Sequence, residues 1–359
     1  MKILVAMSGG VDSSVAAKLL TDAGHECIGC TMKLYENEDI GIPRGHTCCS
    51  LDDVEDARQV AYRLKMPYYV FRFSDDFKEK IIGKFVSAYE NGITPNPCID
   101  CNRYMKFDRL YERARVLGYD HIATGHYAQI EEKDGVYFLK KAVDPAKDQS
   151  YVLYSLAQEQ LAHTLFPLGG LCKEQTRELA RAGGFLNADK PDSQDICFVP
   201  DGNYAAAIER FSGKAAEPGN FVDESGRVLG QHRGIIHYTI GQHKGLGLYS
   251  HEKRFVLRID AVSNTVVLGE EERLFRRNAA VKEINWISGV APAAPVRCAV
   301  KIRYRQKEQP ATLTPVGETC AELLFDEPQR AITPGQAAVF YDGDVVLGGG
   351  VLTGEGENR

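Results

Sequence analysis

The sequence lacks the features that would place the chain in a membrane or outside the cell. Its first residues run directly into an apolar stretch without a signal-peptide pattern, and no apolar run is long enough to span a bilayer. We therefore expect a cytoplasmic protein that makes no membrane contact. In that compartment the 10 cysteines are expected to be core, metal-binding or catalytic residues rather than a disulfide framework.

The chain also lacks internal repeats, low-complexity segments and an excess of basic residues. The formal net charge is −6, and all of it falls in residues 1–203, where 24 Lys and Arg face 30 Asp and Glu. The net charge therefore does not indicate a nucleic-acid partner, and a nucleic acid would have to bind at local basic clusters. The candidates are residues 301–307 and the group of Arg273, Arg276 and Arg277, although such clusters are more often solvated faces.

Hydrophobic periodicity predicts three domains in the 359 residues. Up to residue 203, strand and helix patterns alternate, which is typical of an α/β domain whose parallel sheet is covered on both faces. Short β segments punctuated by glycine follow, and the last strand patterns suggest a closing β-barrel. The predicted domains are residues 1–203 (α/β), 204–275 (small, β-rich) and 276–359 (barrel).

A glycine turn near the N-terminus is the most informative motif. Ser8-Gly9-Gly10-Val11-Asp12-Ser13-Ser14 follows a strand pattern and precedes a helix pattern. Glycines that permit close approach, hydroxyl donors and the free N–H groups of a helix N-terminus together form a nest for phosphate or pyrophosphate. Neither a Walker A sequence nor Gly-x-Gly-x-x-Gly is present. Asp12 would repel phosphate unless a cation lay between them, which suggests Mg²⁺.

Two cysteines are candidates for sulfur chemistry. The prolines of Asn96-Pro97-Cys98-Ile99-Asp100-Cys101 fix an extended approach to a predicted helix over about 101–117, so Cys101 is expected at its N-terminus with a lowered thiol pKa. Cys197 is remote in sequence, and a reactive thiol with a second, resolving thiol suits sulfur transfer. A buried thiol and a zinc half-site shared with Cys98 are the alternatives.

The other cysteines fall into two groups. Cys48 and Cys49 lie in a polar loop and could be metal-binding, redox-active or incidental. Core packing is the interpretation for the remaining five, which are Cys27, Cys30, Cys172, Cys298 and Cys320.

With these motifs in order, the chain resembles the bacterial tRNA-specific 2-thiouridylases, which convert the wobble uridine of certain tRNAs to 2-thiouridine. The resemblance covers nearly the whole chain and includes the pyrophosphate loop of ATP pyrophosphatases. It rests on residues 6–13, 94–102, 123–127, 147–150, 193–198, 237–242 and 304–306. It implies an adenine nucleotide α hydrolase domain, a central β-rich domain and a C-terminal β-barrel. The implied partners are tRNAs for lysine, glutamate and glutamine and a cysteine desulfurase or sulfur-relay protein, with no DNA.

The resemblance also implies roles for single residues. ATP would contact Ala6, Met7, Ser8, Gly9, Gly10, Val11, Asp12, Ser13, Met32 and Gly125. The tRNA would contact Asn96, Pro97, Cys98, His126, Lys147, Asp148, Gln149, Tyr304, Arg305 and Gln336, with residues 96–98 at the target base. Cys101 would be the nucleophile and Cys197 the persulfide carrier, and the two would close a disulfide after transfer. The expected reaction adenylates the uridine C2 oxygen, releases pyrophosphate and lets sulfur displace AMP.

One departure from the family pattern leaves the sulfur carrier open. Many members have Asp where this chain has Cys98, and that Asp has been proposed as an acid/base; Asp100 does not occupy the position. Cys98, Cys101 and Cys197 could instead hold an iron–sulfur cluster that presents sulfide to the activated base, and zinc is the competing occupant. The other function classes are another pyrophosphate-loop enzyme, such as an amidating synthetase or tRNA lysidine synthetase, and a non-catalytic tRNA-binding protein.

Overall fold

A five-stranded parallel sheet forms the centre of the N-terminal domain. The computed structural model describes residues 1–36, 51–192, 196–248 and 253–354. The strands lie in the order β3-β2-β1-β4-β7, with all neighbouring pairs parallel. Their bounds are β1 Lys2–Ala6, β2 Glu26–Lys33, β3 Tyr68–Arg72, β4 His121–Ala123 and β7 Thr164–Leu165. The chain leaves β1 in one direction and returns to β4 on its other side, so the carboxyl ends of β1 and β4 flank a switch point, where open α/β sheets bind ligands.

Helices cover both faces of this sheet, as the sequence predicts. Along β1, Ile3 and Val5 are buried in one hydrophobic cluster and Leu4 in another, because successive side chains of a strand point to opposite faces. The first cluster is closed by α1 Val11–Asp22, α2 Leu51–Arg63 and α8 Lys173–Ala182. The second is closed by α3 Ser74–Phe77, η1 Lys78–Gly83, α4 Lys84–Glu90, α5 Pro97–Asp100, η2 Cys101–Arg109 and α6 Leu110–Val116.

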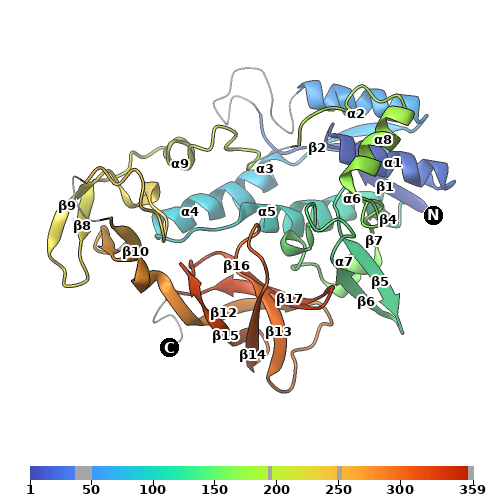
Figure 1. Ribbon diagram of the computed structural model, residues 1–359. Coiled ribbons are helices and arrows are strands. Elements are labelled where there is room, and N and C mark those ends of the chain that lie inside the picture. Colours follow the sequence, from blue (N-terminus) through green and yellow to red (C-terminus); the bar gives the residue numbers. More distant parts are fainter. Residues whose placement is uncertain (37–50, 193–195, 249–252, 355–359) are drawn as a thin grey trace.

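The six helical elements of the second group join end to end into two continuous helices, each with a π-helical segment in its middle. We call each of these helices a rod. One runs from α3 through η1 to α4, and the other from α5 through η2 to α6 (Figure 1). The second rod begins at Pro97, four residues before the start that the sequence suggested. Between residues 150 and 186 the sequence predicts two helices, and the structure has the 3₁₀ turn η3 Ser150–Val152, the short helix α7 Gln158–Ala162 and α8.

The central domain is β-rich, as expected. Helix α9 Tyr204–Ser212 leads into a four-stranded sheet of order β10-β11-β8-β9. Its elements are β8 Gly219–Val222, β9 Val228–His232, the 3₁₀ turn η4 Ile235–His237, β10 Phe255–Asp260 and β11 Thr265–Gly269. Ile208, Phe221 and Val266 belong to the same buried cluster as Leu4, so the central domain shares a core with the N-terminal domain.

The predicted C-terminal barrel is present and closed. After the 3₁₀ turn η5 Glu271–Leu274, six strands follow one another in the order β12-β15-β14-β13-β16-β17, and β17 pairs back with β12. Their bounds are β12 Phe275–Trp286, β13 Val296–Lys301, β14 Gln309–Val316, β15 Cys320–Arg330, β16 Ala337–Asp342 and β17 Val345–Leu352. Among the residues described, no helix has the length and apolar character needed to cross a membrane.

A hairpin from the N-terminal part of the chain ties the first domain to the barrel. Strands β5 Gln129–Lys133 and β6 Val136–Lys140 pair with each other, and Lys140 pairs with Val345 of β17 (Figure 1). Just beyond β6, the Lys141 ammonium forms an ion pair with Glu308 of the barrel at 2.7 Å. The sequence predicts the hairpin, but not that it extends the barrel sheet. This attachment places residues 147–149 beside residues 301–308.

Candidate active site

The glycine turn has the geometry of an anion nest. Gly9 has φ +75°, and a Cβ there would collide with the backbone of Asp53, so only glycine fits. Gly10 is the N-cap of α1, with extended backbone and no side-chain cap. The first-turn amides of α1 have no carbonyl partner within the helix and point out beyond the carboxyl end of β1. Backbone N–H groups are therefore the donors that this loop offers to a phosphate.

The hydroxyls of Ser13 and Ser14 have partners within the protein, whereas Ser8 is exposed and lines the cavity. Ser13 Oγ accepts a hydrogen bond from Ser8 N and donates one to Gly10 O, each at 3.1 Å. Ser14 Oγ donates to Gly10 O at 2.9 Å and accepts from the amide of Asn187 at 3.0 Å. Ser13 and Ser14 are both buried, so these two side chains brace the turn.

A lysine that the sequence did not single out neutralises Asp12. The Lys173 ammonium, at the start of α8, lies 2.7 and 2.9 Å from the two oxygens of Asp12. The Tyr127 hydroxyl donates to the same carboxylate at 2.8 Å. We expected Mg²⁺ because a cation was needed beside Asp12, and the structure places Lys173 in that position. The groups around Asp12 therefore fit an ion pair rather than a metal site.

The ion pair continues towards the segment of Cys197. Lys173 also bonds Asp192 at 2.7 Å, and Lys147 bonds the other oxygen of Asp192 at 2.8 Å. Burial favours the neutral form of Asp192, but the hydrogen bonds from Lys147 and Lys173 outweigh it and lower the pKa of this carboxyl. Alternating charges thus connect Lys147, expected to contact tRNA, with the phosphate loop.

Gly125 lies against the phosphate loop, as expected of a nucleotide-site residue. It follows β4, and a Cβ at this position would lie 2.6 Å from Ser13 N and 2.7 Å from the carbonyl carbon of Asp12. Met32 lies on β2, two residues beyond the partner of Ala6, so it shares the carboxyl edge of the sheet with the loop. The structure thus brings Ala6, Met32 and Gly125 to one edge.

Replacing Gly125 by alanine is expected to weaken ATP binding about 10-fold, because the added methyl group would push the loop amides out of position. Titration calorimetry with ATP would measure the loss. Gly170→Ala is the matched control, since a Cβ there meets open space and should leave the affinity unchanged. Equal affinities for the two variants would contradict a tight packing of Gly125 on a working phosphate loop.

One cavity of about 1380 Å³ is lined by ten of the 22 candidate residues, which include Cys197 but not Cys101. Its wall on the N-terminal domain includes the phosphate loop, Asp192 and Cys197, and its wall on the barrel carries basic and aromatic side chains. Residues predicted for ATP that line it are Ser8, Gly10, Val11 and Asp12; those predicted for tRNA are Lys147, Asp148, Gln149, Tyr304 and Arg305. Lys301, Arg305 and Lys307 of the basic cluster 301–307 therefore line this cavity, whereas Arg303 does not. In the other cluster, Arg273 pairs with Glu224 at 2.7 Å.

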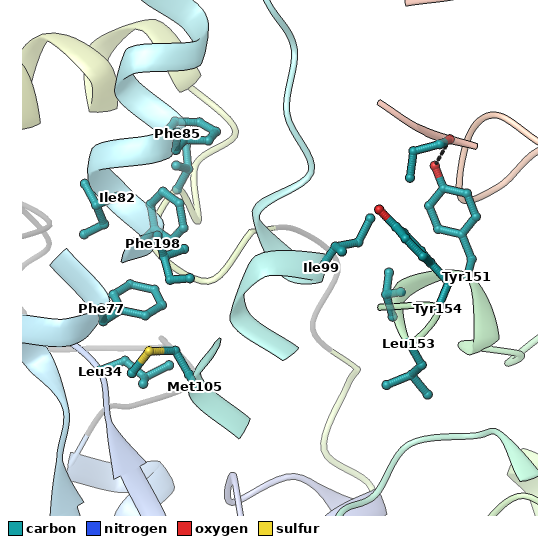
Figure 2. Close-up of a cluster of buried hydrophobic side chains, with 14 of the residues drawn as sticks. Leu34, Phe77, Ile82, Phe85, Ile99, Met105, Tyr151, Leu153, Tyr154 and Phe198 are labelled. Carbon is teal, nitrogen blue, oxygen red and sulfur yellow. Dashed lines mark hydrogen bonds between the residues drawn. The ribbon is translucent and has the colours of Figure 1, made fainter. Parts of the chain in front are cut away.

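Cys197 is fixed by its neighbour in the sequence. Phe198 is fully buried, with its ring 5.7 Å from that of Phe77 and 5.2 Å from that of Phe85, both in edge-on contact (Figure 2). The Tyr35 hydroxyl donates to the Cys197 carbonyl at 2.9 Å. Residues 193–195 of this motif lie outside the described residues, as do Cys48 and Cys49. These contacts anchor the backbone of Cys197, and Cys197 itself lines the cavity.

Cys101 packs on the same buried cluster as Cys197 but lies within its helix rather than at its start. Asn96 caps the rod, accepting from Cys98 N at 3.2 Å, and Pro97 is its first residue. Burial raises the pKa of the Cys101 thiol, with Lys106 opposing the rise and Asp100 adding to it. The expectation of a dipole-lowered pKa was wrong, because Cys101 is a full turn inside the rod and partly buried.

Lys106 and His126 form a pair beside Cys101 that the sequence did not reveal. The Lys106 ammonium lies 3.4 Å from His126 Nε2, and Thr124 Oγ1 lies 2.7 Å from Nδ1. An ammonium only donates, so Nε2 accepts and the Nδ1 proton is directed at Thr124. Burial and the Lys106 charge lower the pKa of His126 well below 6.5, so the ring is neutral. Within the described part of the chain, Lys106 has no carboxylate at ion-pair distance.

Alkylation of Cys101 is expected to speed up with pH to beyond 9.0, the ordinary pKa of the thiol, because burial raises this pKa and the thiolate is the reactive form. Lys106→Met would raise the pKa further and slow alkylation at pH 7 several-fold, while Lys133→Met on the distant hairpin should not. Mass spectrometry of iodoacetamide-treated protein would give both rates. A faster reaction in Lys106→Met would contradict the electrostatic role.

Several residues expected to contact tRNA have internal partners in this structure. His126 is buried in this structure, and its contact with tRNA stays a prediction. Asp148 is also buried and accepts hydrogen bonds from Ala142 N and from Ser150. Gln149 accepts from Tyr127 N at 2.9 Å, and Gln336 donates to Thr94 O at 2.9 Å. These side chains hold the loops that carry Lys147 and residues 96–98.

The three cysteines proposed as cluster ligands do not form a metal site here. In the described ranges, no group of three or more His, Cys, Asp or Glu side chains has a metal-binding arrangement. Cys98 is exposed at the start of the rod, and its charge contributes, after burial and Asp148, to the raised pKa of Tyr304 on the barrel. Asp100 pairs with Lys84 at 2.9 Å, so it is not placed as a base for Cys101.

The remaining cysteines follow the core interpretation in part. Cys27, Cys30 and Cys298 are buried, and Cys172 is partly buried. Cys320 is exposed on β15, so the core interpretation was wrong for it: the strand alternates, and Cys320 points outward.

Comparison with known proteins places this arrangement in a family. Family models match residues 1–201 (tRNA methyl transferase HUP domain), 207–270 (tRNA methyl transferase PRC-barrel domain) and 276–352 (aminomethyltransferase beta-barrel domain). The tRNA-specific 2-thiouridylase MnmA of Clostridioides difficile (strain 630) is 51% identical over 353 residues, 98% of each chain. That of Clostridium acetobutylicum is 50% identical over 351 residues, 98% of this chain and 99% of the relative. The chain belongs to the tRNA-specific 2-thiouridylase family.

Membership of the 2-thiouridylase family confirms the resemblance and the three-part fold. The descriptions of the family models refer to methyl or aminomethyl transfer, whereas the names of the relatives refer to thiolation. The relatives match almost the full length at about 50% identity, so we assign the family from their names. Among solved structures, a complex of 4-thiouridine synthetase with RNA and ATP matches 55% of this chain and 45% of that chain, at 19% identity and TM-score 0.37. A likeness this low adds nothing to the assignment.

Proposed function

We propose that this chain uses ATP to convert the wobble uridine of tRNA to 2-thiouridine. The observation that supports it most is the single cavity shared by the phosphate loop, Cys197, Lys147 and the Tyr304–Arg305 pair. An enzyme that activates an RNA base with ATP and then delivers sulfur needs an anion nest, a thiol and an RNA-binding wall around one volume. The names of its relatives agree with this chemistry.

The first step transfers AMP from ATP to the uridine C2 oxygen and releases pyrophosphate. Oxygen on C2 is a poor leaving group, and the adenylate makes it a good one. The α1 amides and the helix dipole stabilise the charge on the departing pyrophosphate, with Lys173 cancelling the repulsion from Asp12. No step is assigned to Mg²⁺ or to an iron–sulfur cluster, because the described residues do not fit either.

The second step moves sulfur through two thiols. The terminal sulfur of a persulfide on Cys197 attacks C2, AMP leaves, and the base is joined to Cys197 through a disulfide bond. Cys101 attacks the Cys197 sulfur, which frees 2-thiouridine and leaves a Cys101–Cys197 disulfide. The two thiols supply the electrons that reduce the transferred sulfur, and an external thiol restores them. Both cysteines pack against one buried hydrophobic cluster, which supports this pairing.

The RNA is held between the N-terminal domain and the barrel. Residues 96–98 contact the target base, extruded from the anticodon stack, and Tyr304 and Arg305 bind the neighbouring RNA. The substrates are tRNAs for lysine, glutamate and glutamine, and a cysteine desulfurase or relay protein loads Cys197 in the bacterial cytoplasm. We take residues 1–203, 204–275 and 276–359 as the nucleotide, central and barrel domains.

The test is nucleoside mass spectrometry of tRNA treated with protein stripped of iron and zinc, in the presence of ATP, Mg²⁺, desulfurase and cysteine. Formation of 2-thiouridine is the expected result and would show that a cysteine persulfide is a sufficient sulfur carrier. If product forms only after anaerobic cluster reconstitution, Cys98, Cys101 and Cys197 would be assigned as cluster ligands. Absence of product under both conditions would contradict the proposed function.

A further inference from the structure

Cys98 is a third thiol close to the two that transfer sulfur, and the reaction proposed above gives it no chemical step. It lies one helical turn before Cys101, at the exposed start of the rod. Cys101 and Cys197 are partly buried and pack against one hydrophobic cluster. A disulfide between Cys101 and Cys197 would therefore be partly buried, whereas the side chain of Cys98 is exposed to solvent.

The backbone between Cys98 and Cys101 is tightly wound. The amide of Cys101 donates to the carbonyls of both Pro97 and Cys98, and the amide of Ile99 donates to Asn96 O at 3.2 Å. Hydrogen bonds between residues three apart are typical of a 3₁₀ turn, in which the side chains of residues i and i+3 are aligned. The turn thus brings the side chains of Cys98 and Cys101 to the same side of the rod.

This spacing is compatible with a disulfide between Cys98 and Cys101. Helix geometry places Cα atoms three residues apart at about 5 Å, inside the range of roughly 4.4 to 6.8 Å that disulfides have. On a regular helix the Cβ atoms would have to approach by about 1 Å, and the 3₁₀-type winding moves them in that direction. Regular α-helical winding ends here, because the π-helical segment η2 begins at Cys101.

Cys98 also lies near the wall of the large cavity. Its charge adds, after burial and Asp148, to the raised pKa of Tyr304, and Tyr304 lines that cavity together with Cys197. Cys98 belongs to the segment 96–98, to which we assign the target base. The base would therefore cover Cys98 during sulfur transfer and uncover it when the product leaves.

We propose that Cys98 resolves the Cys101–Cys197 disulfide that sulfur transfer leaves and moves it to the protein surface. The Cys98 thiolate attacks the Cys101 sulfur and the bond to Cys197 breaks. The electron pair leaves on the Cys197 sulfur, which takes up the proton that Cys98 lost. The products are a Cys98–Cys101 disulfide and a Cys197 thiol that is ready to receive the next persulfide sulfur.

An external dithiol then completes the cycle. It attacks the exposed Cys98 sulfur, which releases the Cys101 thiol, and it closes its own disulfide to release Cys98. The dithiol is oxidised and supplies the two electrons that each transferred sulfur consumes. The origin of the first disulfide rests on the proposed function, whereas the exchange between Cys98 and Cys101 depends only on the three thiols.

The first test maps disulfides without tRNA or ATP. The full-length protein, stripped of iron and zinc, is oxidised with diamide, remaining thiols are blocked with N-ethylmaleimide, and unreduced peptides are identified by mass spectrometry. In the wild type, Cys101 should be recovered mainly in a disulfide with Cys98. In Cys98→Ser it should be recovered in a disulfide with Cys197. A wild type in which Cys101 pairs mainly with Cys197 would overturn the proposal.

The second test compares the first turnover of 2-thiouridine formation with later ones. With a thioredoxin-type protein dithiol as the reductant, Cys98→Ser should lose far more of its later turnovers, about 10-fold, than of its first, because a protein dithiol reaches a partly buried disulfide poorly. A high concentration of dithiothreitol, a small dithiol, should restore the later turnovers. Cys320→Ser, which removes another exposed thiol, should behave as the wild type with either reductant.

The outcomes separate this proposal from the proposed function. Equal losses in the first and later turnovers of Cys98→Ser, without rescue by dithiothreitol, would limit Cys98 to contact with the base and overturn the proposal. Product that requires a reconstituted iron–sulfur cluster would also overturn it, because Cys98 would then be a cluster ligand. A Cys98–Cys101 disulfide after diamide in a protein that forms no 2-thiouridine would reject the proposed function and support the thiol exchange alone.

Discussion

Replacing Cys101 or Cys197 by serine is expected to abolish 2-thiouridine formation while pyrophosphate release continues. A serine hydroxyl can neither carry a persulfide nor resolve a disulfide, so the loss should be at least about 1000-fold. Adenylation uses the phosphate loop, which neither substitution touches. Cys320→Ser is the control, because this thiol is exposed on β15 of the barrel and should be dispensable.

The two serine variants are expected to stop at different points. Cys197→Ser should acquire no persulfide on that residue when incubated with desulfurase and cysteine. Cys101→Ser should accumulate tRNA joined to Cys197 through a disulfide, which dithiothreitol releases and intact-mass spectrometry detects. Full activity in a Cys101→Ser, Cys197→Ser double variant would contradict sulfur transfer and favour another pyrophosphate-loop enzyme.

The sequence predicts the α/β domain well because its signals are local. The glycine turn and the amphipathic pattern behind it define β1, the loop and α1, and all three are present. Strand β14 is harder, since Pro310 and Pro315 interrupt its pattern; it is a strand because its neighbours in a closed barrel supply the pairing. The place of the β5–β6 hairpin depends on a partner strand more than 200 residues away, which no local pattern encodes.

The candidate site likewise combines features that a local sequence pattern predicts with contacts that only the fold brings together. The sequence contains a signal for the start of the rod that carries Cys101, because Asn followed by Pro is typical of a helix N-terminus. A helix predicted to begin at Pro97 would have placed Cys101 one turn inside that helix. Lys173 could not be found this way: its ammonium meets a carboxylate 161 positions earlier, and only the fold brings them together. Lys106 and His126 are likewise neighbours only through the packing of the rod against β4.

Lys173→Met is expected to weaken ATP binding roughly 30-fold. The substitution leaves Asp12 charged and unpaired beside the amides that hold the triphosphate. Loss of one partner of a fully buried ion pair costs about 3 to 5 kcal/mol; because the Asp12 side chain is 30% exposed while that of Lys173 is 8% exposed, we expect about 2 kcal/mol. Lys18→Met is the control. It breaks an exposed ion pair with Asp22 on α1, the helix that carries Asp12, and should have almost no effect on ATP affinity.

The double variant Asp12→Asn, Lys173→Met separates charge repulsion from a general loss of packing. If repulsion by the unpaired carboxylate is the cause, removing it should restore part of the ATP affinity, and the two substitutions will not be additive. Titration calorimetry and thermal melting of all four proteins complete the cycle. A Lys173→Met protein that binds ATP as tightly as the wild type would show that another cation neutralises Asp12 when the nucleotide arrives, and a metal ion at Asp12 would then be the explanation to test.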